Sequence, residues 1–549
     1  MKRRHLLSAA GLLPLLMAEK PLQAAEQLAR QPATEPMAAG PFNPDWKSLE
    51  QYAVPDWYGD AKFGIWAHWG PQCQAEAGDW YARGMYEEGG RQYNYHLKKY
   101  GHPSKVGFKE VIHDWKAEKW DPDALVALYK RAGAQYFVAL ANHHDNFDNY
   151  DSAYQPWNST RIGPRKDLIG GWAKAARHHG LRFGVSVHAS HAWTWMETAQ
   201  RADRKGPLKG VPYDGNLRAA QGKGTWWEGL DPQDLYAQNH PLSKQSDDNN
   251  ALHGQWDWGD GASLPDAAYH RKFYNRTVDL INKYDPDLIY FDDTALPLWP
   301  ASTVGLKVAA HYYNKSLAKN GKVEVVINGK ILNEQQRKCL VWDIERGQSD
   351  KIEPQVWQTC TCIGDWHYNR SVYEDHRYKS AQTVVHTLAD VVSKNGNLLL
   401  SVPVRGDGSI DSDEVAVVEG IAKWMALNSE SIFATRPWKI FGEGPAQENA
   451  APLSKQGFNE GKGKPFGPAD IRFTTKGEVL YAIVLGWPED GKVLVRSLAA
   501  NNPLRPQPIQ AVSLCGGAPL KFTRSERGLE VTLPREKPET HYAFALKIV

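Results

Sequence analysis

Cysteine is scarce in this chain, with five residues among 549. An odd number without a regular spacing excludes a disulfide scaffold. The one closely spaced pair has no second pair at zinc-binding spacing, which argues against a structural zinc site. We therefore expect buried free thiols, at Cys73, Cys339, Cys360, Cys362 and Cys515.

Motifs that carry several common chemistries are also missing. The sequence contains no H-E-x-x-H motif of metalloproteases and no G-x-S-x-G elbow of serine hydrolases. No G-x-G-x-x-G follows a predicted strand, which argues against a dinucleotide cofactor. We predict a protein that uses neither a catalytic metal nor an organic cofactor.

Excess charge of one sign is absent as well. Lys and Arg number 65 against 63 Asp and Glu, which gives a formal net charge of +2. Nucleic-acid-binding domains carry a strong basic footprint, so we expect no nucleic-acid partner.

The N-terminus has an apolar run, from Leu6 to Met17, that is too short and too interrupted to span a membrane. It follows Arg3-Arg4 and is followed by small residues at Ala24-Ala25, a pattern typical of export signals of the Sec or twin-arginine type. We predict a signal peptide at residues 1–25 and a flexible linker at 26–43. The mature protein would then be periplasmic or secreted, without a membrane anchor.

Aromatic residues are abundant, with 22 Trp and 24 Tyr. Most such residues fill cores, but an excess of this size also suits a site that stacks sugar rings. A segment of little periodicity, 192–264, is long for a loop, and long loops are usually functional. We expect it to form a wall of the active site. Its tryptophans either border that site or pack within the loop; they are Trp226, Trp227, Trp256 and Trp258.

Between residues 62 and 427 the sequence alternates apolar strands with amphipathic helices. This alternation predicts a parallel sheet, and so many units predict a closed (β/α)8-type, TIM-like barrel over residues 44–437. The expected strands are 63–68, 136–141, 181–188, 288–291, 323–328, 339–345 and 398–402. The expected helices are 122–131, 167–179, 266–284, 304–318, 380–392 and 413–427.

After Pro437 the pattern changes to short alternating runs separated by turns. This pattern predicts an antiparallel β-sandwich over residues 438–549, to which we assign a structural role, with sugar binding as the weaker alternative. The expected strands are 471–473, 479–485, 493–496, 520–523, 529–533 and 541–548.

Polar residues end the predicted barrel strands, and in a closed barrel these ends lie on one face. The polar groups are His68, Asn142 to Asp145, His188, Asp292-Asp293, Asn328 and Asp343 to Arg346. For any single His, a structural role is the more common explanation. Their convergence instead favours a site in which two carboxylates, flanked by His and Trp, cleave a glycosidic bond.

Several segments resemble glycoside hydrolase family 29, the α-L-fucosidases. They occur in the family's order across the presumed barrel. The segments include Lys62 to Gly70, Asp79 to Tyr86, His143 to Asp145, Gly163 to Leu168, Leu181 to Val185, Tyr290 to Asp292, Asn395 to Leu400 and Asp407 to Ile410.

The resemblance implies a barrel followed by a β-sandwich, and an exo-acting hydrolase that releases terminal α-L-fucosyl residues from glycans with retention. By position, Asp292 matches the family's nucleophile, and Asp293 beside it has turn capping as its default role. Glu345 is the expected acid/base, with Asp343 and Glu353 as competitors. Residues matching or neighbouring the family's sugar pocket are His68, Asp79, Trp80, His143, His144, Ser186, His188 and Lys330.

Three positions depart from the family's usual residues. Asp79 stands where Glu is common, Lys330 where Arg is common, and Ser186 where Tyr is frequent. Changed hydrogen-bonding groups can change sugar preference by orders of magnitude. L-Galactose and L-glucose therefore stay open beside L-fucose, and the competing class is a non-catalytic carbohydrate-binding protein on a glycosidase barrel.

Overall fold

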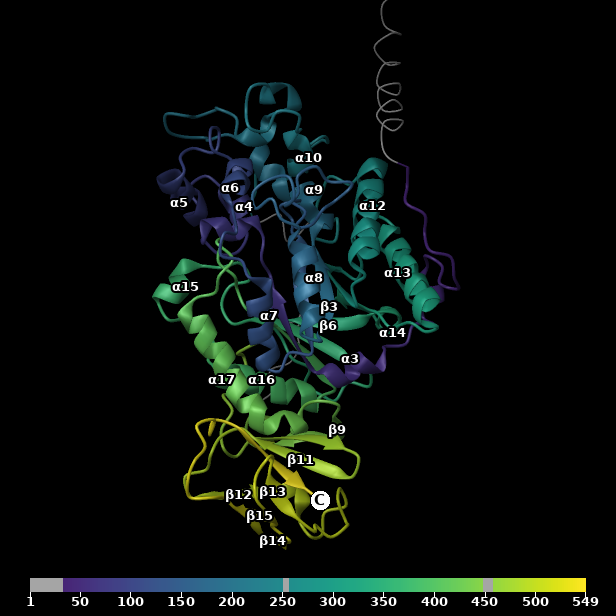
Figure 1. The fold of residues 1–549 in the computed structure, drawn as a ribbon, viewed down its shortest axis with the longest axis vertical. Coiled ribbons are helices and arrows are strands. Elements are labelled where there is room, and N and C mark those ends of the chain that lie inside the picture. The colour runs from purple at the N-terminus through teal and green to yellow at the C-terminus, as the bar shows by residue number, and fades with distance from the viewer. Residues whose placement is uncertain (1–32, 250–255, 448–457) are drawn as a thin grey trace, which may run out of the picture.

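A computed structural model of the protein describes residues 33–249, 256–447 and 458–549. Its larger part is a barrel closed by eight parallel strands that pair in chain order (Figure 1). The strands are β1 Phe63–Ala67, β2 Tyr136–Asn142, β3 Arg182–Val187, β4 Leu288–Thr294, β5 Val326–Lys330, β6 Val341–Glu345, β7 Trp357–Cys362 and β8 Gly396–Ser401. The predicted barrel is confirmed.

Alternate side chains of the barrel strands meet inside the barrel. Trp66, Val138, Tyr290 and Leu399, from four different strands, belong to one buried apolar cluster. The intervening side chains pack outward against the helices, as period-two alternation requires. Residues two apart on one strand therefore share a face, which places the strand-end groups over the barrel interior.

Six long helices cover the barrel at the positions that periodicity predicted. They are α7 Pro122–Arg131, α8 Leu168–His178, α12 Ala267–Tyr284, α13 Val304–Asn320, α16 Ala381–Ser393 and α17 Ser412–Asn428. Asp167 and Asp266 cap two of them, each accepting a hydrogen bond from a main-chain amide in the first turn. Shorter helices are α2 Trp46–Leu49, α3 Asp56–Ala61, α4 Tyr81–Gly84, α5 Arg91–Lys99, α6 Phe108–Asp114, α9 Ala192–Trp195, α10 Pro232–Tyr236, α14 Gln336–Cys339 and α15 Arg370–Glu374.

One barrel strand was not predicted. β7 has the sequence Trp-Gln-Thr-Cys-Thr-Cys, whose alternation of polar and weakly apolar residues gives no clear strand signal. Its pairing with both β6 and β8 fixes it as a strand. Tertiary pairing here overrides a weak local preference.

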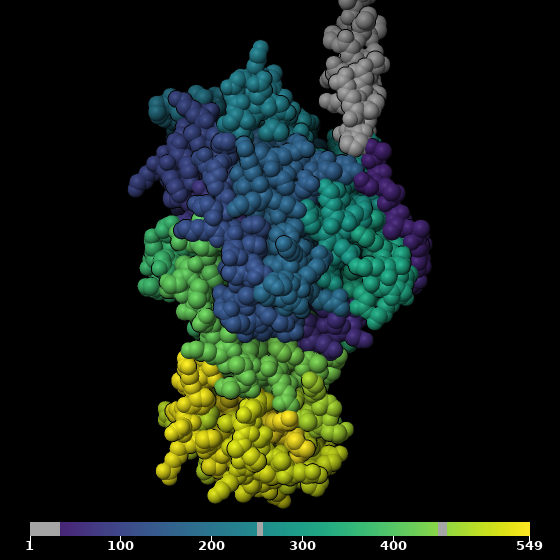
Figure 2. All heavy atoms as spheres, in the orientation of Figure 1, coloured from purple at the N-terminus to yellow at the C-terminus, as the bar shows by residue number. Residues whose placement is uncertain are grey.

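The C-terminal part consists of two antiparallel sheets around a second apolar core, which confirms the predicted sandwich. One sheet holds β9 Arg436–Glu443, β10 Ile471–Lys476, β11 Val479–Val484, β13 Val512–Leu514 and β16 Phe544–Ile548; the other holds β12 Lys492–Val495, β14 Lys521–Ser525 and β15 Gly528–Thr532. Sequence patterns missed β9 and β13. Figures 1 and 2 show the sandwich at the end of the barrel opposite the described part of the insertion, residues 192–249 and 256–264.

Buried contacts join the sandwich to the barrel. The Arg472 guanidinium on β10 pairs with the Asp390 carboxylate on α16 at 2.6 Å, and both side chains are almost fully buried. The Trp424 indole N–H on α17 donates to the Ala543 carbonyl at 2.9 Å. The interface between the two parts is therefore buried as deeply as the interior of a domain.

Residues 33–43, expected to be part of a linker, run along α12 and α13. The Glu35 amide donates to Asn275 Oδ1 at 2.8 Å, and the Phe42 amide donates to Asn314 Oδ1 at 3.0 Å. The predicted signal peptide lies outside the described residues. Among the helices that are described, none is long and apolar enough to cross a bilayer.

Candidate active site

Two carboxylates and an ammonium group meet at the carboxyl-terminal edge of the barrel. Asp292, Lys330 and Glu345 lie on β4, β5 and β6. Lys330 Nζ donates to Asp292 Oδ1 and, at 2.8 Å, to Glu345 Oε2. Two hydrogen bonds that share one nitrogen span at most about 6.4 Å, so the bridged oxygens are no farther apart than that. Retaining glycosidases separate their carboxyl groups by about 5–5.5 Å.

Two histidines contact the second oxygen of the Asp292 carboxylate. His188 Nδ1 lies 3.0 Å from Asp292 Oδ2, and His144 Nε2 lies 3.3 Å from the same atom. The other nitrogen of His144 lies 2.7 Å from the His188 carbonyl oxygen, an acceptor that fixes the ring's orientation. The side chain of Asp292 is 16 % exposed and that of Glu345 15 %, so both reach the surface of a largely enclosed site.

The groups that contact Asp292 outweigh its burial. Burial by itself would raise the pKa of this carboxyl, but the Lys330 ammonium and His188 hold it well below its usual range. Burial likewise opposes the charge on Lys330, yet the two carboxylates hold the pKa of its ammonium well above the ordinary value. Asp292 is therefore an anion at neutral pH, as a nucleophile requires.

Three histidines of the site, His68, His143 and His188, are neutral. Burial lowers the pKa of His188 to about 4 and places those of His68 and His143 well below the ordinary value. Both ring nitrogens of His68 and Nε2 of His188 are buried and lack a hydrogen-bond partner among the described residues. Neutral imidazoles with free nitrogens can accept from, or donate to, sugar hydroxyls.

The two competing acids lie elsewhere. Asp343 points into the barrel beneath Glu345, where it accepts hydrogen bonds from Gln358 and the Cys360 thiol at 2.8 and 3.1 Å. Burial raises the pKa of Asp343 to about 7. Glu353 is at the opposite end of the barrel, where its amide donates to the carbonyl of Lys394, just before β8. Of the three acids, Glu345 alone has a carboxylate that pairs with the Lys330 ammonium beside Asp292.

The remaining predicted pocket residues surround this centre. The Asp79 carboxylate accepts from the His367 amide at 2.7 Å, and Trp80 begins α4 with a left-handed φ of 64°. Ser186 lies opposite Tyr290 in the β3–β4 register, and its buried hydroxyl has no partner in the part of the chain described. His143 Nδ1 lies 2.9 Å from Gln72 Nε2.

The structure adds residues that sequence reasoning missed. The His367 ring is 4.8 Å from the rings of both His68 and His143, and the Trp366 ring is 5.7 Å from that of His68. Both residues follow β7, and they were missed because this strand was not predicted. The Trp-His pair after a Thr/Cys run was the available signal.

Asp293 and His191 form a second buried pair behind the nucleophile. The Asp293 carboxylate accepts from Ser190 Oγ at 2.7 Å and lies 2.9 Å from His191 Nε2. Asp293 therefore fastens the residues after β3, a larger role than the turn capping expected of it.

The insertion brings two tryptophans to the site, Trp195 and Trp256, and the Trp195 ring lies 5.6 Å from that of His144. The Trp256 ring stacks on His191 at 4.0 Å and lies 5.7 Å from Lys330 Nζ. Trp258 stacks on the same histidine, whereas Trp226 stacks on His113 away from the centre. Trp256 thus forms part of the predicted wall.

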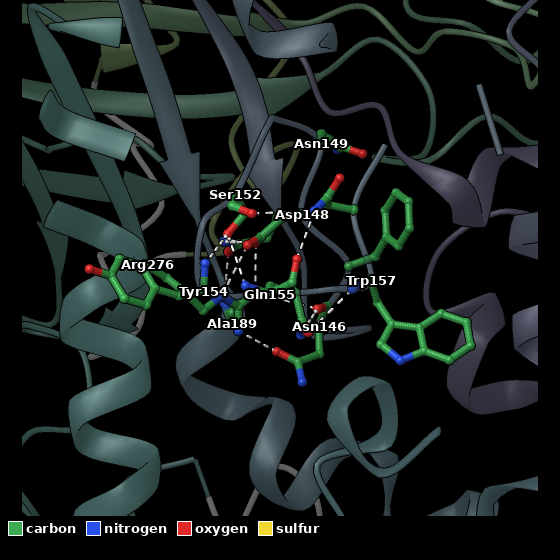
Figure 3. Close-up of polar contacts among 12 residues, drawn as sticks. Asn146, Asp148, Asn149, Ser152, Tyr154, Gln155, Trp157, Ala189 and Arg276 are labelled. Atoms are coloured by element: carbon green, nitrogen blue, oxygen red, sulfur yellow. Dashed lines mark hydrogen bonds and ion pairs between the residues drawn. The ribbon is translucent and has the colours of Figure 1, made fainter. Parts of the chain in front are cut away.

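A buried polar network fixes the segment after β2 that carries His143 and His144 (Figure 3). Arg276 on α12 donates to Asp148 Oδ1 at 2.6 Å and to Asn146 Oδ1 at 2.5 Å. The Asn142 amide also donates to Asp148, at 2.9 Å. The helix and the strand therefore hold this segment from both sides.

Two sets of side chains at the site bring metal-ligand atoms within 4.8 Å of one another. Histidines gathered around sugar hydroxyls produce the same grouping, so the absence of a catalytic metal stays a prediction. The sets are His68, His143 and His188, and His144, His188 and Asp292.

A closed barrel with paired carboxylates among histidines, followed by a β-sandwich, is the arrangement of a glycoside hydrolase. The family model described as alpha-L-fucosidase matches residues 29–430, and that of the alpha-L-fucosidase C-terminal domain matches residues 466–549. The chain therefore belongs to the α-L-fucosidase family.

Relatives and solved structures agree with this assignment. The chain is 26 % identical to the tissue alpha-L-fucosidase of Bos taurus over 92 % of its length and 91 % of that protein, and 25 % identical to the Homo sapiens protein over the same shares. An alpha-fucosidase structure from Thermotoga maritima matches with a TM-score of 0.66 and 25 % identity, covering 92 % of this chain and all of that one. A Bacteroides thetaiotaomicron structure, at 16 % identity and a TM-score of 0.57, supports the fold.

Proposed function

We propose that this protein is an exported, retaining exo-glycosidase that removes terminal α-L-fucosyl residues from glycans. The observation that carries the proposal is the Lys330 bridge, which brings the carboxylates of Asp292 and Glu345 together on one ammonium group and so supports a retaining pair. Family membership supports the sugar class, and the apolar N-terminal run supports export to the periplasm or the medium.

In the first step, Asp292 attacks the anomeric carbon while a protonated Glu345 donates to the glycosidic oxygen. The aglycone leaves, and a covalent glycosyl–enzyme ester forms. Lys330 keeps Asp292 ionised until attack. The neutral rings of His68, His143 and His188 hold ring hydroxyls without adding charge that would oppose an oxocarbenium-like transition state.

In the second step, Glu345, now ionised, removes a proton from water, which attacks the same carbon. The Asp292 ester breaks, and the sugar leaves with its original configuration. The proton taken from water leaves Glu345 protonated and Asp292 ionised beside Lys330, which is the state in which the first step begins.

A related α-L-sugar is the second candidate substrate. Its support is Ser186, whose buried hydroxyl is unpartnered among the described residues and could pair with an additional sugar hydroxyl. α-L-Galactosides carry such a hydroxyl at C6, where fucose has a methyl hydrogen.

A panel of 4-nitrophenyl α-L-glycosides tests both points at once. We expect nitrophenol release from the fucoside, and a lower or comparable rate with the galactoside. The sugar first released should be the α anomer, as observed by NMR. Release from no member of the panel would favour the non-catalytic carbohydrate-binding protein, and a β anomer would exclude retention.

A further inference from the structure

Phe458 places an exposed aromatic ring beside the main chain of Glu345. The Phe458 amide donates to the Glu345 carbonyl at 2.9 Å, although the two residues are far apart in sequence. The side chain of Phe458 is 45 % exposed. Its φ of +54° is unfavourable for a residue with a bulky side chain. Such strain persists only where surrounding contacts impose it.

Those contacts hold residues 458–460 along the end of β6. The Glu460 amide donates to the Arg346 carbonyl at 2.9 Å. The Asn459 side chain accepts from the Gln348 amide at 2.8 Å and donates to the Gln348 carbonyl at 3.0 Å. This segment, which lies between β9 and β10 of the sandwich, is therefore fixed at the active-site edge.

The side chain of Glu460, in the same segment, is fixed as well. The Glu460 carboxylate accepts from Thr361 Oγ1 at 2.7 Å and from Lys379 Nζ at 2.5 Å. Thr361 lies at the end of β7, the strand next to β6. Phe458 thus stands on a rigid support while its own ring faces solvent.

A cation and an aromatic ring connect this segment to the sugar pocket. The Arg346 guanidinium lies 4.9 Å from the centre of the Trp366 ring. Trp366 in turn lies 5.7 Å from His68, in the pocket proposed to bind the cleaved sugar. Arg346 and Trp366 therefore link that pocket to the main chain of residues 458–460, which carries Phe458.

We propose that Phe458, Arg346 and Trp366 form the subsite for the aglycone, and that its occupant is a sugar. The inference rests on the proposed function. Glu345 must protonate the glycosidic oxygen, so the leaving group lies on the Glu345 side of the cleaved bond. Phe458 there offers an aromatic surface for an apolar sugar face, and Arg346 offers N–H donors for hydroxyls. The enzyme accordingly selects di- and oligosaccharides over small aglycones.

The test compares two substrates that differ in the aglycone. α-L-Fucosyl fluoride has no aglycone sugar, whereas α-L-fucosyl disaccharides of N-acetylglucosamine and galactose do. Phe458→Ala should lower kcat/KM for at least one disaccharide about tenfold, which equals about 1.4 kcal/mol, and change that for the fluoride less than about twofold. Phe458→Trp, which keeps an aromatic ring, should retain most of the disaccharide activity.

Leu427→Ala on α17 is the matched control, because Leu427 is an apolar side chain of similar exposure, 48 %. It should leave both substrates unchanged. Equal losses of Phe458→Ala on fluoride and disaccharides, or no loss on either disaccharide, would overturn the subsite. A wild-type protein that hydrolyses neither kind of substrate would instead overturn the proposed function, and the subsite with it.

Discussion

Lys330 joins two carboxylates that must behave differently in the proposed reaction. Its contact with Asp292 is the main interaction that opposes burial and keeps this carboxyl ionised. The depressed pKa of Asp292 adds stability above the pKa of an unfolded aspartate, near 4, and that contribution is lost as pH falls through the lower folded value. One side chain thereby affects both the activity and the acid tolerance of the site.

Removing this charge should shift the pH profile. In Lys330→Met the pKa of Asp292 rises, because burial is no longer offset by the ammonium. We expect the acidic limb of kcat/KM to move to higher pH by about one unit or more. Lys330→Arg keeps the charge and should shift the limb less. An unchanged acidic limb in the Met variant would contradict this role.

Removing the proposed nucleophile should abolish most turnover. Asp292→Gly is expected to lower kcat on 4-nitrophenyl α-L-fucoside by about 10³-fold or more, since no covalent intermediate forms. Added azide should restore part of the nitrophenol release by occupying the space of the lost carboxylate. Near-normal activity without azide would show that another residue attacks.

Removing the proposed acid/base should separate good from poor leaving groups. Glu345→Ala is expected to slow hydrolysis of disaccharides about 10²–10⁴-fold. Loss on the aryl fucoside should be much smaller in the first step, because nitrophenolate leaves without protonation. Pre-steady-state nitrophenol bursts measure that step. Equal loss with both substrates would assign the proton transfer to another group.

At the scale of elements, the segment after β2 shows how a barrel holds its catalytic edge. His143 and His144 follow a strand end, yet their position depends on Arg276, which reaches the segment from α12. Arg276 and Asp148 are both buried, so breaking their pair leaves an uncompensated charge.

Arg276→Met should therefore destabilise the protein by about 3–5 kcal/mol, measured by urea unfolding. Lys272→Met on the same helix is the control, because its pair with Asp234 is partly exposed and contributes at most about 1 kcal/mol. If Arg276→Met lowers the free energy of unfolding as little as the control does, the Arg276 network does not stabilise the protein.

At the scale of the whole molecule, the sandwich and the barrel depend on each other. Arg472 shares the buried Asp390 carboxylate with Lys394, whose ammonium lies 2.6 Å away. The positive charges of Lys394 and Arg472 hold the pKa of the Asp390 carboxyl below its usual value despite its burial. The interface thus couples the unfolding of the two parts.

Arg472→Met should lower Tm in calorimetry, with a loss of about 3 kcal/mol, and should weaken the barrel as well as the sandwich. Lys492→Met, whose pair with Glu530 is exposed on the sandwich, should leave Tm nearly unchanged. A Tm equal to that of the wild type in Arg472→Met would indicate that the two parts unfold independently.

Local sequence determined much of this protein. Apolar runs and helix caps gave seven of the barrel strands and six long helices, because periodicity reports directly which face each element buries. Polar strand ends pointed to Asp292, Glu345 and the histidines, since parallel strands deliver their last residues to one edge. β7 was not predicted, because its Thr, Cys and Gln residues form a strand only between two neighbouring strands that supply the hydrogen bonds.

Only the tertiary structure decided which groups touch. The Lys330 bridge needs three strand ends at one height, and Trp256, Trp366 and Phe458 reach the same edge from separate connections. Such contacts join residues distant along the chain, and their geometry follows from barrel closure and from the packing of connections upon it. The residues adjacent in sequence therefore do not determine that geometry.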